Sequence, residues 1–188
     1  RRCERIATGA AWQTVGYMNT ARAQHTATLL KNGNVLVTGG INGPALATTG
    51  IYNYLTRSWA LGAAMADARY SHTATLLKDG RVVVAGGSFG GGPMSTTERL
   101  LPPSYAAWLP SSSMEFERAN HKATLLTNGK ILLTGGETLG ATRKEGDLYT
   151  TDFDFYAKFG EAKTRQNHTA VLALDGKIYI IGGWDGTK

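Results

Sequence analysis

The hydrophobic positions of this chain fall into short runs that are paired around a turn signal. Four times along the sequence, two apolar runs flank an Asn-Gly or Asp-Gly dipeptide. Such a dipeptide suits a type I′ turn, in which both central residues have positive φ, so each pair of runs predicts a β-hairpin. The runs are apolar at nearly every position rather than alternating, which is typical of strands covered on both faces. The predicted strand pairs are 26–30 with 35–37, 73–77 with 82–84, 123–126 with 131–133, and 169–174 with 178–181.

The hairpins belong to a longer repeat. Each one is preceded by Arg-x-x-His and followed by Gly-Gly, and the step from the His to the first Gly is 14 residues in every copy. Successive histidines lie 47, 49 and 47 residues apart, a nearly fixed period that predicts a repeat architecture. The copies are Arg22, His25 and Gly39-Gly40; Arg69, His72 and Gly86-Gly87; Arg118, His121 and Gly135-Gly136; and Arg165, His168 and Gly182-Gly183.

Each repeat has room for two further strands after the Gly-Gly pair. A polar, glycine-rich connection of variable length comes first, and its composition predicts a loop. The third runs lie around 51–52, 98–101 and 147–149, and the fourth runs centre on Trp59, Trp108 and Phe155 or Tyr156. One unit is therefore predicted to contain four strands, with an aromatic residue on the outermost strand.

The two ends of the chain are expected to share one unit. Residues 3–6 and 11–15 supply a third-type and a fourth-type strand, whereas the C-terminus follows a second-type strand. Pairing the strands of the two ends would remove exposed sheet edges that invite aggregation. The expected units of this single domain, 1–188, are about 24–62, 71–110, 120–159, and 167–183 together with 1–15.

This combination of features resembles the kelch repeat. The Arg-x-x-His start, the double glycine, the Tyr or Glu-Arg third strand and the following Trp are shared, and they cover essentially the whole chain. Repeats one to three are similar to the bacterial extracellular variety, whereas the fourth (KIYIIGGWDGTK, 177–188) is similar to the eukaryotic substrate-adaptor variety. The resemblance implies an all-β fold, a β-propeller of four-stranded kelch blades. We expect four blades with the last closed by N-terminal plus C-terminal strands. A larger ring assembled from several copies and a fragment of a larger propeller are the alternatives.

Composition and charge narrow the choice of partners. The net charge is +6, but the basic residues are scattered, and the Trp and Tyr residues occupy framework positions rather than interleaving with basic ones. We therefore expect no nucleic-acid partner, and an acidic protein or peptide suits this charge better. No apolar run is long enough to span a bilayer, so no membrane association is expected. The chain has a single cysteine, Cys3, so cysteine content does not indicate the cellular compartment.

The repeated histidines raise the question of a metal-binding site, since His is a common metal ligand. Each lies at the same place in a different repeat, so a ring would hold them apart, and we expect each to hydrogen-bond between neighbouring blades. Copper enzymes resembling galactose oxidase share the kelch scaffold, but no Tyr partner for Cys3 is identifiable, so no metal or cofactor is expected. The chain has no Gly-x-Ser-x-Gly elbow and no pair of carboxylates arranged for acid/base work, so we expect no enzymatic activity.

The candidate binding residues lie on the connections that enter the innermost strands and on nearby loops. In kelch domains this entry resembles a position at one mouth of the central channel, where guanidinium groups would present forked donors to carboxylates or phosphates. The alternative is that each Arg pairs locally and fixes its own loop. The candidates are Arg22, Arg69, Arg118, Arg165, Tyr70, Asn120, Asn167 and Trp184.

These observations predict a non-catalytic binding module or scaffold that recognises a protein or peptide, with an acidic one favoured, through loops at one mouth of the propeller. The chain is expected to be a monomer if its four blades close, and otherwise a homo-oligomer that completes a larger ring. One alternative is a fragment of a larger secreted galactose-oxidase-like or carbohydrate-active propeller protein. Another is an engineered or recombined propeller scaffold without a natural ligand. Fold alone does not decide among these functions.

Overall fold

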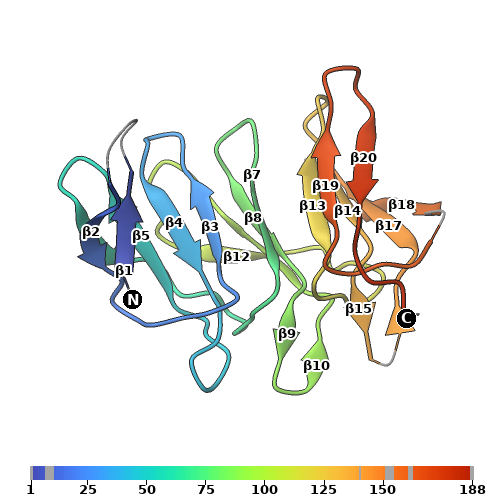
Figure 1. Ribbon diagram of the computed structural model, residues 1–188, viewed down its shortest axis with the longest axis horizontal. Helices are drawn as coiled ribbons and strands as arrows, with labels where there is room; N and C mark the ends of the chain where they lie inside the picture. The colour runs from blue at the N-terminus through green and yellow to red at the C-terminus, as the bar shows by residue number, and fades with distance from the viewer. Residues whose placement is uncertain (1, 7–10, 140, 151–154, 161–162, 187–188) are drawn as a thin grey trace.

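The protein is built from antiparallel β-sheets that stand side by side in chain order, from β1–β2 at one end to β19–β20 at the other (Figure 1). The computed structural model describes residues 2–6, 11–139, 141–150, 155–160 and 163–186. Within these ranges all regular secondary structure consists of β-strands. The described residues contain no helix that is long and apolar enough to cross a membrane. The predicted all-β fold is confirmed.

Three sheets are complete four-stranded blades, in which neighbouring strands of the repeat are hydrogen-bonded in chain order. The first blade consists of β3 (Thr26–Leu29), β4 (Val35–Thr38), β5 (Thr49–Asn53) and β6 (Ser58–Leu61). The second consists of β7 (Thr73–Leu76), β8 (Val82–Ala85), β11 (Thr97–Leu100) and β12 (Trp108–Ser111). The third consists of β13 (Lys122–Leu125), β14 (Ile131–Thr134), β17 (Glu145–Tyr149) and β18 (Phe155–Gly160). The predicted hairpins and the third and fourth strands of these repeats are all present.

The remaining strands form two-stranded sheets. The ends of the chain supply β1 (Arg2–Arg5) with β2 (Gln13–Tyr17), and β19 (Thr169–Leu172) with β20 (Ile178–Ile181). Two connections predicted as loops also contain short hairpins, which are β9 (Ser88–Phe89) with β10 (Gly92–Pro93), and β15 (Glu137–Thr138) with β16 (Ala141–Thr142). The sequence pattern missed these hairpins because their strands are too short to show a hydrophobic period.

The hairpin turns differ in type from the predicted one. In the first turn Gly33 has φ +83° whereas Asn32 does not have a positive φ, and Gly33 N–H donates to Leu30 O at 3.0 Å. The Asn32 side chain instead accepts the backbone N–H of Asn34 at 3.1 Å. Asn and Asp make this bond two residues onward readily, and it favours a longer turn that ends in a single left-handed Gly. The prediction of a type I′ turn is therefore wrong, although the predicted hairpins are present.

A polar contact recurs between neighbouring blades. Each of three buried histidines places Nε2 against a Thr hydroxyl of the preceding blade. The pairs are His72 with Thr38 at 2.9 Å, His121 with Thr73 at 2.9 Å, and His168 with Thr134 at 2.8 Å. The predicted inter-blade role of these histidines is confirmed. The first one, His25, lies instead on the face of the first blade that lines a cavity beside β1–β2.

The first three Gly-Gly pairs fit against the backbone of the next repeat. The N–H of Gly87 donates to Arg118 O at 2.9 Å, and a Cβ on Gly86 would lie 2.4 Å from the same oxygen. Gly86 also has φ +59°, which L side chains rarely adopt. Gly39 and Gly135 are in the same position, each with a Cβ site 2.4 Å from the carbonyl oxygen of the next Arg. Glycine is therefore required here by two independent constraints.

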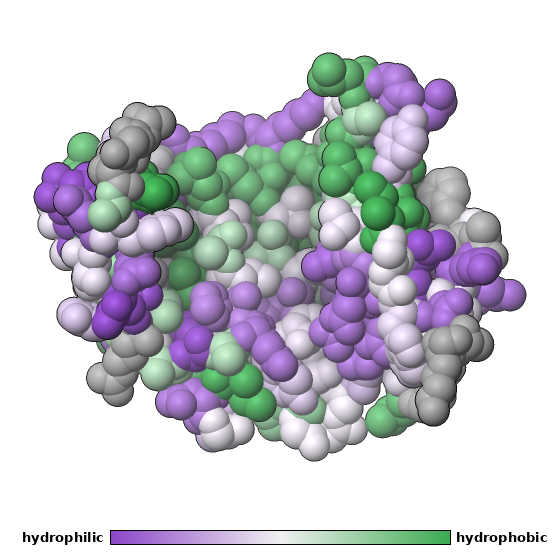
Figure 2. All heavy atoms as spheres, in the orientation of Figure 1, coloured by the Kyte–Doolittle hydropathy of each residue, from purple (hydrophilic) through white to green (hydrophobic). Residues whose placement is uncertain are grey.

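The expected closure of the fourth blade is not found among the described strands. Strand β1 pairs with β2, β20 pairs with β19, and the two sheets lie at opposite ends of the arc (Figure 1). A cavity of about 590 Å³ separates β1–β2 from the inner strands of the first blade. Figure 2 shows a hollow between the ends, with hydrophobic residues along its upper part. The Gly-Gly junction joins the first blade to the second, the second to the third, and the third to β19–β20. Among the described strands, those of the two chain ends therefore belong to separate sheets, β1–β2 and β19–β20.

Replacing Gly86 by Ala tests the junction, and Gly182→Ala is its matched control. Gly182 also has a positive φ, +67°, but no atom lies within 4 Å of its Cβ site. We expect Gly86→Ala to lower the free energy of unfolding by about 3 kcal/mol through steric overlap plus backbone strain. Gly182→Ala should cost only the backbone strain, about 1 kcal/mol. Equal losses in urea titrations of the two variants would contradict this account of the junction.

The buried histidines should make stability fall in mild acid. Desolvation lowers the pKa of His72 to about 3 and that of His168 to about 4. The unfolded chain binds a proton near pH 6.5 whereas the folded one does not, so stability is full above that pH and falls as the pH decreases toward the folded values. The loss is about 1.4 kcal/mol per pH unit for each such histidine.

The variant His72→Gln isolates one of these contributions. It should be less stable than the unsubstituted chain at pH 7.5, because the bond to Thr38 is altered. The difference in unfolding free energy between the variant and the unsubstituted chain should be smaller at pH 5, because the unsubstituted chain loses stability in acid through His72 and the variant does not. Urea unfolding at the two pH values measures both quantities, and a deficit that is independent of pH would refute the assignment.

Candidate functional site

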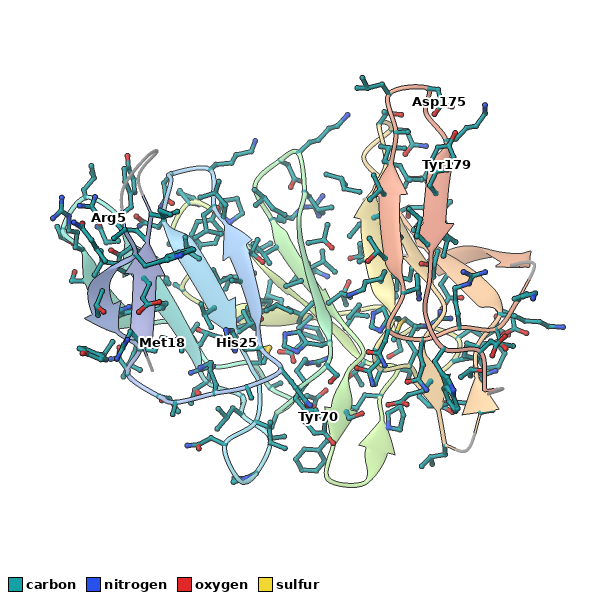
Figure 3. All side chains as sticks on the ribbon, viewed as in Figure 1. Arg5, Met18, His25, Tyr70, Asp175 and Tyr179 are labelled. Carbon is teal, nitrogen blue, oxygen red and sulfur yellow. The ribbon has the colours of Figure 1, made fainter. Side chains whose placement is uncertain are left out.

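Two sets of connections meet at one end of the propeller, which we call the Gly-Gly mouth. One set enters the innermost strands and the other follows the Gly-Gly pairs, and isolated β-bridges such as Tyr70 with Ser88 and Gln166 with Trp184 join them. Figure 3 shows Tyr70 at this end and Asp175, in a hairpin turn, at the opposite end. The segments are 22–25, 69–72, 118–121 and 165–168, together with 41–48, 88–96, 137–139, 141–144 and 184–186.

The arginines of the central repeats are not presented at this mouth. Arg69 and Arg118 are both 0% exposed. Arg69 donates through Nη1 to Gly86 O at 2.8 Å and through Nη2 to Glu98 Oε1 at 2.9 Å. Burial lowers the pKa of Arg69, and the nearby Glu98 carboxylate opposes that shift. The arrangement fits the alternative in which each Arg pairs locally and fixes its loop.

Arg118 repeats these contacts one blade later. Its Nη1 donates to Gly135 O at 2.9 Å and its Nη2 donates to Asp147 Oδ2 at 2.8 Å. Asp147 is buried, so the ion pair is shielded from water. Removing one partner of such a pair would leave an uncompensated buried charge and destabilise the blade. Because both arginines are fully buried, neither is presented to an external ligand.

The outer arginines have different surroundings. Arg22 is half-buried and donates to Gly39 O at 2.6 Å and Thr48 O at 2.8 Å. Arg165 donates to Gly182 O at 3.1 Å. At the register position that Glu98 holds in the second blade, the first blade has Gly50. All four arginines therefore share the bond to the carbonyl of the first Gly, whereas the described carboxylate partners belong to the second and third repeats.

Sequence reasoning missed the carboxylates that hold these arginines. Glu98 and Asp147 lie on third strands, where the pattern predicted only structural positions. A signal was present, because in both repeats the carboxylate follows its Arg by 29 residues. A charged residue inside a strand covered on both faces needs a partner of opposite charge. The shared spacing could have identified that partner.

A chain of backbone hydrogen bonds runs around the inner edge of the mouth. The N–H of Ser71 donates to Gln24 O, that of Asn120 to Ser71 O, and that of Asn167 to Asn120 O, each at 3.0 Å. All four residues have φ between 50° and 60°. Asn adopts this left-handed conformation more readily than most residues. The candidates Asn120 and Asn167 thus have backbones fixed by the scaffold, while the Asn167 side chain is exposed.

Large side chains project from the loops of the same mouth. Trp184 is 53% exposed, Phe89 is 54% exposed, and Leu139 is 74% exposed. Tyr70 is half-buried beside β9. Positions equivalent to Trp184 hold Ile41, Ser88 and Glu137, so its indole is specific to the fourth repeat and not a requirement of the fold. Of the predicted site residues, Tyr70, Asn120, Asn167 and Trp184 are brought together at the mouth.

Comparisons with known proteins agree with this architecture. The kelch motif model matches residues 167–188, which lie in the fourth repeat. No curated protein matches the chain in sequence. Among solved structures 168 chains match, and one of them, the structure of YjhT, has a TM-score of 0.78 at 16% identity. That match covers 93% of this chain and 64% of that chain, so this chain spans less than two thirds of it.

The two comparisons bear on the motif and on the fold, and neither tests the number of repeats. The family model covers one repeat, and the structural match at this identity concerns the fold alone. The remaining repeats carry the same Arg-x-x-His and Gly-Gly features in equivalent structural positions. The chain thus contains a segment, residues 167–188, that matches the kelch motif model, and its overall fold is similar to that of the YjhT structure.

Proposed function

We propose that this chain is a binding module that recognises a protein or peptide at the Gly-Gly mouth. The observation that carries the proposal is the exposure of Phe89, Leu139 and Trp184 on loops whose bases are held by the repeated backbone hydrogen bonds. Aromatic side chains at a rigid, solvent-exposed site are the groups that dominate protein interfaces. Variable loops on a fixed scaffold are where binding residues concentrate.

The loops of the mouth differ from repeat to repeat while their anchors stay the same. The second and third repeats carry the hairpins β9–β10 and β15–β16, and the first repeat has a connection without strands in this region. These two hairpins lie against each other, since a Cβ on Gly92 would be 2.9 Å from Leu139 Cδ2. The result is a continuous surface from Phe89 to Leu139, suited to a peptide that spans neighbouring repeats.

The preference for an acidic partner loses part of its support. It was based on the net charge of +6 and on arginines presented at the mouth, and Arg69 and Arg118 are fully buried and paired with carboxylates. The proposal therefore keeps the protein or peptide partner and relies on the exposed apolar and aromatic side chains rather than on the arginines.

Selection from a random peptide library on the immobilised chain tests this function. Peptides that bind the unsubstituted chain should lose at least about tenfold in affinity to Trp184→Ala or Phe89→Ala, which corresponds to one interface hot spot. The matched control is Leu174→Ala, because Leu174 is a fully exposed apolar residue in the fourth hairpin turn, at the opposite end. Peptides that respond only to the Leu174 change, or the absence of any enriched peptide, would refute the proposed function.

A further inference from the structure

A polar cavity of about 530 Å³ opens between the third and fourth repeats at the Gly-Gly mouth. Its walls come from β15–β16 on one side and from the segments around Gln166 and Trp184 on the other. Among the residues that line it, Glu137 is the one with an ionisable side chain. The cavity also holds the hydroxyl of Thr142, the amide of Gln166 and the indole of Trp184. It therefore combines one negative charge, neutral hydrogen-bonding groups and an aromatic ring.

The carboxylate of Glu137 is held in place by a neutral partner. Its Oε1 accepts a hydrogen bond from Asn120 Nδ2 at 2.7 Å. The backbone of Glu137 is bonded in both directions to Ala119, with N–H to carbonyl distances of 2.9 and 3.0 Å. An amide partner orients the carboxylate without neutralising it, so the negative charge remains available to a ligand.

The neighbouring arginines are engaged with other acidic groups. Arg118 pairs with buried Asp147 at 2.8 Å. Arg143 lies 3.7 Å from Glu117 and stacks over Phe116, with 4.2 Å from its guanidinium carbon to the ring centroid. Arg118 and Arg143 are thus already engaged with other carboxylates, and Glu137 is the acidic residue among those that line the cavity.

Trp184 supplies the second element of a cation site. Its backbone is fixed by hydrogen bonds to Gln166 at 2.9 and 3.0 Å, whereas 53% of the residue is exposed. The face of an indole attracts a cation through its quadrupole, and a planar guanidinium stacks on it well. Glu137 and Trp184 follow the Gly-Gly pairs of adjacent repeats, so the scaffold brings the carboxylate and the ring to one cavity.

We propose that this cavity binds a basic side chain, an arginine of the partner peptide, between the Glu137 carboxylate and the Trp184 indole. The guanidinium forms an ion pair with Glu137, stacks on Trp184, and donates its remaining N–H groups to the oxygens of Thr142 and Gln166. This inference rests on the proposed function and specifies the partner's chemistry at one subsite. It also reverses the charge preference that the arginine pattern predicted.

The test uses N-acetyl-arginine amide as the probe and follows the indole N–H resonance of Trp184 in the ¹H–¹⁵N spectrum of the full chain. Trp184→Phe assigns the resonance. N-acetyl-citrulline amide is the control ligand, since it has nearly the same shape without the charge. We expect a saturable shift with the arginine probe and at least tenfold weaker binding of the citrulline probe. Equal effects of the two probes, or no shift with either, would overturn the proposal.

A pair of charge-matched variants completes the experiment. Glu137→Gln keeps the acceptor for Asn120 and removes only the charge, and it should weaken the arginine probe about tenfold, the usual value of a charge-assisted contact. Asp175→Asn removes the same charge at the opposite end and retains an acceptor for the Lys177 N–H, so it should leave binding unchanged. If both variants weaken binding equally, the probe senses overall charge and the cavity is not its site.

The outcomes separate this inference from the proposed function. If the library yields mouth-binding peptides without basic residues and the arginine probe leaves Trp184 unaffected, the cavity assignment fails while the binding module stands. If the probe binds but no peptide does, the cavity is a cation site and the wider peptide-binding role fails.

Discussion

The structure depends on the contact between each of the first three Gly-Gly pairs and the backbone carbonyl of the next repeat's arginine. The second Gly donates its N–H to that carbonyl, and the first Gly leaves no room for a Cβ beside it. The guanidinium of the same arginine turns back to the carbonyl of the first Gly in its own blade. One residue therefore ties two sheets together, through its main chain on one side and its side chain on the other.

This junction explains why the mouth can vary without loss of the scaffold. The bonds that hold the connections are made by backbone groups and by buried side chains of the repeat. The repeated β-bridges at the positions after the Gly-Gly pairs are made by backbone groups, so Ile41, Ser88, Glu137 and Trp184 can differ there. Glu137 and Trp184 belong to different repeats, and the cavity between them exists because the junction sets neighbouring blades side by side.

Parts of the architecture followed from local patterns. The strands were predictable because apolar runs, Asn-Gly or Asp-Gly turns and Gly-Gly pairs act over a few residues. The turn type was not, because the Asn32 side chain bonds the backbone of Asn34 and selects a different geometry. The ion pairs of Arg69 and Arg118 join residues that are 29 positions apart. That shared spacing is visible in the sequence, but the register of the third strand against the second, which places the carboxylate in its sheet, is known only from the assembled structure.

The sequence by itself determined the repeat, the strands within it and the inter-blade role of His72, His121 and His168, because these depend on spacing and on the backbone freedom of glycine. It also placed Tyr70, Asn120, Asn167 and Trp184 on connections at one end. Only the tertiary structure decided that Arg69 and Arg118 point inward to carboxylates, that the terminal strands lie apart, and that Glu137 and Trp184 share a cavity. The physical reason is that burial, charge pairing and the angle between blades arise from contacts between segments distant in sequence.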